Sequence, residues 1–155
     1  MLELLKEFED MKIDELVVKI SKNEEHFCYE LEMLIGSAIR NQQYRENDRI
    51  VANACLEACV FHFVNLAELL PEKEYSKKYY PLIKRANKEI RHLTWDRVTD
   101  EEQKLGVKDK TWFVHDLCKM ILKDYKQLLS SSDIGKNTKF YADINKYLDT
   151  KLPFK

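Results

Sequence analysis

The stretch VANACLEACVFHFVNLAELL, residues 51–70, is apolar on nearly every side when it is projected as a helix. A helix that is hydrophobic all round its circumference is buried among other elements rather than laid on a surface. The segment is therefore predicted to be the central helix of an all-helical protein. Pro71 follows it directly and is predicted to close it.

The composition of the whole chain is typical of packed helices. Its 155 residues include only three glycines and three prolines, too few for a turn-rich β-protein, and 34% of them are charged. A chain of this length buries roughly two thirds of its unfolded surface without disulfides or metals. The prediction is one domain over residues 1–155, all-α, folded as an up-and-down four-helix bundle with shorter terminal helices.

Apolar residues at helical spacing place the remaining elements. Residues 2–20 are predicted to form two short helices, because Lys12-Ile13-Asp14 indicates a break. The charged stretch 71–80 is predicted to be a crossing, residues 96–109 a loop, and SSSDIGKNT (130–138) a turn. Pro153 is expected to end the ordered region. Further helices are predicted from Ser21 or Asn23 to Tyr44, from Ile50 to Leu70, from Pro81 to about Asp96, from Asp109 or Thr111 to Leu129, and over 138–149.

Net charge and hydropathy limit the partners and the cellular compartment that can be expected for the protein. The 26 basic and 27 acidic residues leave a net charge of −1, so a nucleic acid would need a local basic patch. No apolar run approaches the ~20 residues that span a bilayer, and the N-terminus MLELLKEFED lacks the regions of a secretory signal. We expect a cytoplasmic protein without a membrane span.

The four cysteines, Cys28, Cys55, Cys59 and Cys118, lie in apolar helical patterns. Free cysteines in such positions behave as small buried hydrophobes, so a disulfide framework is not expected. Cys55, Cys59 and His62 share one helical stripe and could present metal ligands, but structural zinc sites usually use cysteine knuckles in turns. Core packing is the favoured interpretation, and no metal and no cofactor are predicted.

The stretch RANKEIRHLTWDR, residues 85–97, is the best candidate for chemistry. At about 100° per residue along one helix, Arg85 and His92 project within about 20° of each other, away from an apolar stripe. In RNA cleavage such a histidine would move the proton of the 2′-hydroxyl, while the arginine would stabilise the developing phosphorane charge. Glu89 and Asp96 on the same face could orient the imidazole. The alternative is a solvated helix stabilised by ion pairs between neighbouring turns.

His62 and Asn65 are unusual polar residues in the nearly all-apolar central helix. Buried polar groups must be paired, so their partners are expected among each other's neighbours or on the helix that carries Arg85. Two interpretations stay open: a satisfied core histidine, or a site formed where these two consecutive helices face each other.

The segments ANACLEACVFHFVNLAELL (52–70) and NKEIRHLTWDR (87–97) resemble a pairing found in small bacterial helical proteins, and over residues 50–100 the chain resembles the HEPN superfamily. The resemblance implies a dimeric helical bundle and, for many members, a metal-independent endoribonuclease with an Arg-x4-6-His motif. Arg85 and His92 satisfy that spacing. HEPN nucleases commonly place Asn, Asp or His directly after the arginine, where this chain has Ala86, and many members are non-catalytic partners.

Two functions follow as expectations. The first is an RNA-binding or RNA-cleaving protein of bacterial or phage defence, similar to a toxin–antitoxin component. The second is a non-catalytic interaction module, a homodimer or a binder of a protein partner, in which the same residues form a polar network between helices and tyrosines 75, 79 and 80 with Trp95 supply interface area. The candidate residues are His92 and Arg85 as catalytic groups, Arg97, Arg91, Lys88 and Asn87 as RNA ligands, and His62 and Asn65 as supporting groups.

Overall fold

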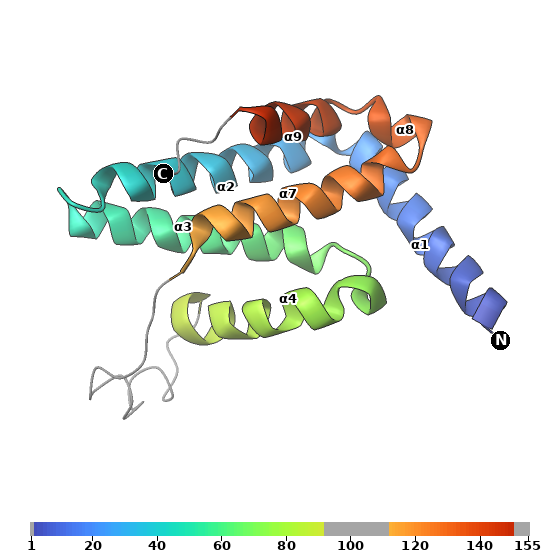
Figure 1. Ribbon diagram of the computed structural model, residues 1–155, viewed down its shortest axis with the longest axis horizontal. Helices are drawn as coiled ribbons and strands as arrows, with labels where there is room; N and C mark the ends of the chain where they lie inside the picture. Colours follow the sequence, from blue (N-terminus) through green and yellow to red (C-terminus); the bar gives the residue numbers. More distant parts are fainter. Residues whose placement is uncertain (1, 92–111, 151–155) are drawn as a thin grey trace.

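The computed structural model of the chain describes residues 2–91 and 112–150, and these residues form helices joined by short connections (Figure 1). No strand occurs in these two ranges, so the all-α prediction is confirmed for them. The elements are α1 (Leu2–Lys22), α2 (Glu24–Tyr44), α3 (Arg49–Glu68), α4 (Glu72–Ala86), the π-helical turn η1 (Asn87–Arg91), α7 (Val114–Ser130), α8 (Asp133–Lys136) and α9 (Lys139–Asp149).

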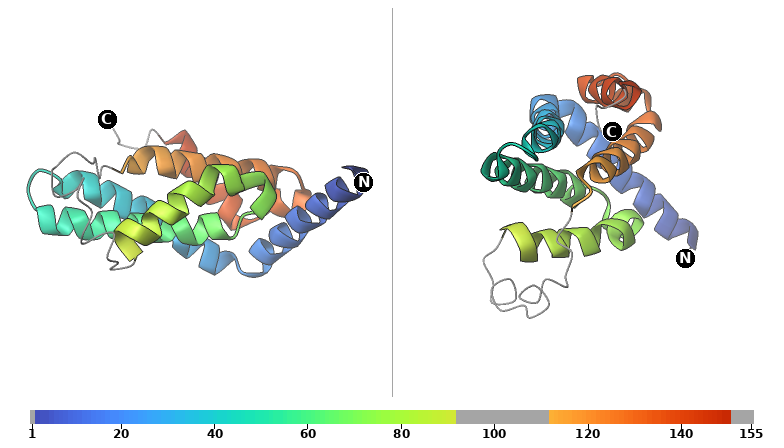
Figure 2. Two further views of the ribbon diagram at one scale, coloured as in Figure 1. Left: turned by 90° about the horizontal axis from the view of Figure 1, so that it is seen from below. Right: turned by 60° about the vertical axis from the view of Figure 1, so that its left-hand side comes forward.

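Helices α2, α3 and α7 form the middle of the molecule (Figures 1 and 2). On one side α9 packs over α2 and α7, and on the opposite side α4 and η1 pack on α3. The amino-terminal half of α1 projects away from the other helices, while its carboxyl-terminal half contacts α8, α2 and α7. Helix α3 therefore has neighbours on most of its circumference, as its apolar sequence predicted.

The core lies where these helices meet. Side chains of α3 such as Phe63 and Val64 are fully buried, and Tyr125 of α7 and Phe140 of α9 stack edge to face with their ring centroids 5.3 Å apart. Burying aromatic side chains of this size removes some 150–250 Å² each from water, which makes them the main source of stability. The polar residues described below are held by this packed centre.

In the first half of the chain the predicted break in the first helix was wrong, whereas the predicted starts of the next two helices are confirmed to within one residue. Helix α1 runs without a break through Lys12-Ile13-Asp14, because Ile13, Leu16, Val17 and Ile20 continue one apolar stripe against the core. Asn23 occupies the N-cap position of α2, but the side chains of Ser21 and Asn23 donate backward to the carbonyls of Val18 and Lys19 and so close α1. Asp48, not predicted, caps α3 by accepting hydrogen bonds from the N–H groups of Ile50 and Val51.

The segment 71–80, predicted to be a crossing, forms most of α4 instead. The helix begins after Pro71 and continues through Pro81 to Ala86. Tyr75 and Tyr79, one turn apart, are buried against α3 and α7, and this burial outweighs the backbone hydrogen bond that Pro81 cannot donate. The two tyrosines therefore belong to the core and not to an interface, and only Tyr80, 65% exposed, faces outward.

The second half differs less from the prediction. Helix α7 starts at Val114, later than Asp109 or Thr111, and Phe113 occupies its N-cap position without a side-chain cap. Within the predicted turn 130–138 the chain makes one helical turn, α8, capped by Ser132. Helix α9 matches the predicted last helix, with Thr138 as its cap. The predicted loop 96–109, Trp95 and Pro153 lie outside the described residues.

By length and composition α3 would be able to cross a bilayer, although no such segment was predicted. Only 44% of its most apolar window is buried, yet the helix packs against α2, α4, η1 and α7. A central helix of a helical protein passes the same test as a membrane span, so these contacts are sufficient to explain its composition.

Candidate functional site

The predicted site begins in α4 and continues into η1. Arg85 lies in the last turn of α4, and Asn87, Lys88, Glu89 and Arg91 lie in the π-helical turn that follows. A π-helix contains more residues per turn than an α-helix, so positions after Ala86 are rotated away from a projection at 100° per residue. A projection at 100° per residue therefore does not apply across Asn87–Arg91, the turn that precedes His92. His92 and Arg97 lie outside the described residues.

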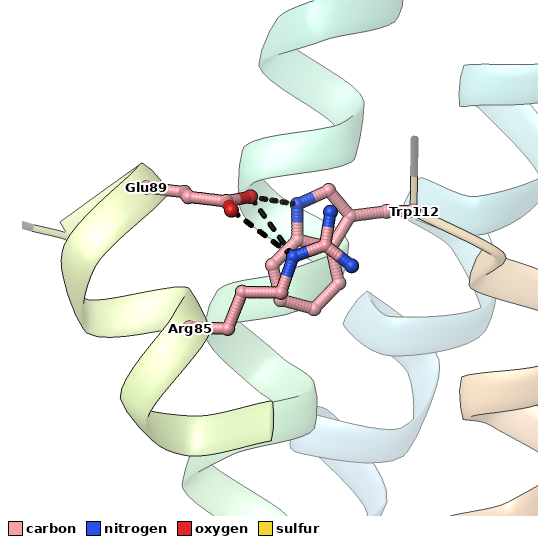
Figure 3. A network of polar contacts seen from close by, with 3 residues as sticks. All are labelled: Arg85, Glu89 and Trp112. Carbon is pink, nitrogen blue, oxygen red and sulfur yellow. Dashed lines mark hydrogen bonds and ion pairs between the residues drawn. The ribbon is translucent and has the colours of Figure 1, made fainter. Parts of the chain in front are cut away.

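Arg85, Glu89 and Trp112 form one polar cluster (Figure 3). The Nε–H of Arg85 donates to both carboxylate oxygens of Glu89 at 3.1 Å each. The indole N–H of Trp112 donates to Oε2 of the same carboxylate, also at 3.1 Å. The guanidinium carbon of Arg85 lies 4.2 Å from the centroid of the Trp112 ring. A carboxylate and an aromatic face thus fix the arginine together.

The Glu89 carboxylate of this cluster is largely buried, so neighbouring groups must balance its charge. The Glu89 side chain is 8% exposed and the Arg85 side chain 32%. A carboxylate taken out of water must be compensated by charge and hydrogen bonds, and here the guanidinium and the indole supply both. Glu89, which was expected to orient His92, binds Arg85 and Trp112. The cluster joins the end of α4 and η1 to Trp112, two residues before the start of α7.

His62 and Asn65 converge on a different element. The Nδ1 atom of His62 lies 2.7 Å from Oε2 of Glu30, and the side-chain amide of Asn65 donates to the same oxygen at 3.1 Å. Glu30 belongs to α2, so the expected pairing of these residues with the Arg85 helix was wrong. The reason is register: α2 runs antiparallel along α3 and places Glu30 beside the apolar turn that carries His62. Further along the same two helices, the side-chain amide of Asn41 in α2 donates to the backbone carbonyl of Ala52 in α3.

The described candidates therefore divide into two groups. Arg85 is held by η1 and Trp112, whereas His62 and Asn65 are held by α2. Lys88 and Asn87 are partly buried in η1, and the Oδ1 atom of Asn87 is buried without a hydrogen-bond partner in the structure. Arg91 is the last residue of η1.

A third polar cluster links α4 to α7 and was not predicted. Asp124, 9% exposed, accepts hydrogen bonds from Lys78 at 2.7 Å and from the hydroxyl of Tyr79 at 2.6 Å. Burial, and then the hydrogen bond to Asp124, raise the pKa of Tyr79 far above its usual range. The phenol therefore remains a donor at any ordinary pH, and its role is to satisfy a buried carboxylate.

The cysteines lie apart from these clusters. Cys59 of α3 and Cys118 of α7 are fully buried, and the neighbouring Cys118 thiol together with burial raises the pKa of Cys59 well above its usual value. In the described parts of the chain, no group of three His, Cys, Asp or Glu side chains is placed to hold a metal ion. The stripe of Cys55, Cys59 and His62 instead contributes to packing and to the Glu30 pair.

Two functional features escaped sequence reasoning for a physical reason. Trp112, in the segment before α7, meets Arg85 and Glu89 through tertiary packing, and Glu30 meets His62 through the register of α2 on α3. Neither contact is encoded by spacing within one helix. One local signal existed for Glu30, since a carboxylate between the buried Phe27 and Leu34 lies at the border of an apolar seam and needs a partner.

The chain matches no family model, no curated protein and no solved structure at a significant level.

Proposed function

We propose that this chain is a non-catalytic helical interaction module, which acts by binding another polypeptide chain. One observation carries the proposal: Arg85 and His62, two of the described candidates with cationic or titratable groups, are each hydrogen-bonded to a carboxylate inside the helix packing. Partners of this kind stabilise a structure and position helices. The resemblance to HEPN proteins, many of which are non-catalytic, supports the same function and a homodimeric state.

The finer architecture belongs to this proposal. Helices α2, α3, α4 and α7 would form an up-and-down four-helix bundle, with α9 as a shorter terminal element. The expectation of a short helix at the amino terminus was wrong, because α1, with 21 residues, is as long as α2. The antiparallel register of α2 on α3 and the packing of α4 on the other side of α3 support that arrangement.

RNA binding or cleavage is the second candidate. It is favoured by the fixed orientation of Arg85, whose side chain is 32% exposed and stacks on Trp112 near the point where the chain leads to His92 and Arg97. A guanidinium positioned by stacking is suited to grip phosphate. In this proposal His92 is the general acid and base, and Arg97, Arg91, Lys88 and Asn87 contact the RNA.

One pair of measurements separates the two functions. Purified wild-type protein and Arg85→Ala are incubated with labelled single-stranded RNA at low salt, and their melting temperatures are recorded. The interaction module predicts no cleavage by either protein and a melting temperature lower by about 4–8 °C in Arg85→Ala, equivalent to roughly 2 kcal/mol. RNA cleavage by the wild type that Arg85→Ala abolishes at unchanged melting temperature would replace the first proposal by the second. Exposed Lys123→Ala is the control for a lost positive charge.

Sedimentation equilibrium tests the homodimer separately. The proposal predicts a mass that rises from one to two chains over a micromolar range of concentration. A single-chain mass at every concentration would leave only a different protein as the partner.

A further inference from the structure

The face formed by α2 and α3 combines exposed aromatic rings with a carboxylate. Tyr29 of α2 is 53% exposed and Phe61 of α3 is 43% exposed. Both rings meet the imidazole of His62 edge to face, with centroid distances of 5.9 Å and 5.5 Å. His62 in turn is paired with Glu30, so two exposed rings and one carboxylate surround a single histidine. We call Tyr29, Glu30, Phe61 and His62 the aromatic–acidic patch.

The Glu30 carboxylate of this patch can accept further hydrogen bonds. Its side chain is 23% exposed, and the hydrogen bonds from His62 and Asn65 both fall on Oε2. No hydrogen bond to Oε1 is found within the described residues. A carboxylate oxygen has about two acceptor positions, so a cationic donor can be added without displacing His62.

Charge around the patch is one-sided. Residues 23–39 and 50–71, which make up most of α2 and α3, contain no lysine and no arginine. The same ranges contain six glutamates: Glu24, Glu25, Glu30, Glu32, Glu57 and Glu68. The backbone N–H of Lys139 in α9 donates to Glu24, so this glutamate is directed toward α9 and not toward the patch, and the ammonium group of Lys139 pairs with Asp143. Glu30, in contrast, is a member of the patch and meets no lysine or arginine from these ranges of its two helices. A carboxylate without a neighbouring cation disfavours nucleic acid and attracts a cationic partner.

From this juxtaposition we propose that the aromatic–acidic patch binds an arginine side chain of a protein partner. A guanidinium is planar and weakly hydrated; it stacks on aromatic rings and donates to a carboxylate in the same pose. The patch offers both partners at once, with Tyr29 and Phe61 for stacking and Glu30 for the ion pair. The proposal rests on the proposed interaction function and specifies the chemistry that the other chain must carry.

The test uses the full chain and a fluorescein-labelled hexa-arginine peptide at low salt. We expect binding that weakens at least tenfold in the variant Tyr29→Ala/Phe61→Ala and in Glu30→Gln, and that falls as salt is added. Tyr80→Ala, which removes an equally exposed ring from α4, is the matched control and should bind as the wild type does. Since Glu30→Gln retains an acceptor for His62, circular dichroism should show all variants folded.

The proposal is overturned if the wild type does not bind hexa-arginine, or if Tyr29→Ala/Phe61→Ala binds it as tightly as the wild type does. It is also overturned if Tyr80→Ala loses as much affinity as Tyr29→Ala/Phe61→Ala, because the attraction would then be non-specific. Conversion of a wild-type dimer to a monomer by Tyr29→Ala/Phe61→Ala would also overturn it, because the occupant would then be a second copy of this chain. The RNA and melting experiments above do not involve this patch, so their outcome distinguishes failure of the interaction function from failure of this assignment.

Discussion

At the scale of single residues, Glu89 is the group on which the candidate site depends. Its carboxylate accepts from Arg85 and Trp112 while only 8% of the side chain is exposed. We predict that Glu89→Ala lowers the free energy of unfolding by about 2 kcal/mol, because a partly buried guanidinium and an indole N–H lose their acceptor. Glu89→Gln, which keeps one acceptor oxygen, should cost less. Urea unfolding measures both.

Glu25→Ala is the control for Glu89, since this glutamate is exposed on α2. Its substitution should change stability by less than about 0.5 kcal/mol. Equal losses in Glu89→Ala and Glu25→Ala would show that the Arg85 cluster contributes no more than an ordinary surface charge.

Tyr79 sets an alkaline limit to stability. Burial and the contact with Asp124 raise its pKa in the folded protein, whereas the unfolded side chain ionises near pH 10. The stabilisation is therefore complete below about pH 10 and is lost as pH rises above it, because only the unfolded chain releases the proton. Tyr79→Phe removes this titration. The urea stability of wild type should fall more steeply than that of Tyr79→Phe between pH 9.5 and 11, by up to about 1.4 kcal/mol per pH unit.

Buried Tyr125 has a raised pKa as well, and it titrates in the same direction in both proteins. Its contribution cancels when the two pH profiles are subtracted. Parallel profiles for wild type and Tyr79→Phe would mean that Tyr79 is ionisable in the folded state, contrary to its burial against Asp124.

At the scale of elements, two glycines differ in the space around them: Gly135 in α8 has no room for a side chain, and Gly36 in α2 has room. A Cβ built on Gly135 in α8 would lie 2.3 Å from the carbonyl oxygen of Leu129, whereas one built on Gly36 in α2 meets no atom within 4 Å. Gly135→Ala should therefore force the α7–α8 connection apart and destabilise the protein by at least 2 kcal/mol. Gly36→Ala should stabilise it by about 0.5–1 kcal/mol through helix propensity. Thermal unfolding compares the two, and a loss in both would show that α2 packs more tightly around Gly36 than the structure indicates.

Sequence predicted elements well where one apolar stripe dominates and poorly where tertiary burial overrides a local signal. The seam of α9 followed from hydrophobic spacing, and the central helix followed from a run that is apolar on nearly every side. In α4, the proline at 81 and the charged flanks indicated a crossing, but burial of Tyr75 and Tyr79 carries the helix through it. The π-helical turn at 87–91 left no periodic signal, so the angular relation of Arg85 to the residues beyond it could not be predicted.

At the scale of the whole molecule, the sequence indicated which polar residues are held in the packing better than it indicated their partners. His62 and Asn65 were predicted to need pairing, and both are hydrogen-bonded to Glu30; Arg85 and Glu89, predicted as parts of a candidate site, are bonded to each other. The sequence could not supply Glu30 or Trp112, because each reaches its partner only through the packing of separate helices. Long-range register, and not residue type, is what the sequence alone leaves undetermined.

Tyr125 of α7 forms a side-chain hydrogen bond with the carboxyl-terminal end of α3. Its hydroxyl donates to the carbonyl of Leu66 at 2.7 Å, in the last turn of α3, where carbonyls have no partner within their own helix. Tyr125→Phe keeps the ring in the core but leaves that buried carbonyl unpaired, so we predict a loss of about 1–2 kcal/mol. Amide hydrogen exchange should accelerate in the last turn of α3 more than at its start. Tyr141→Phe on α9 is the control, because the Tyr141 hydroxyl forms no hydrogen bond within the described residues. If hydrogen exchange in Tyr125→Phe accelerates equally along the whole of α3, the substitution lowers global stability. In that case Tyr125 of α7 does not act as a local cap of α3.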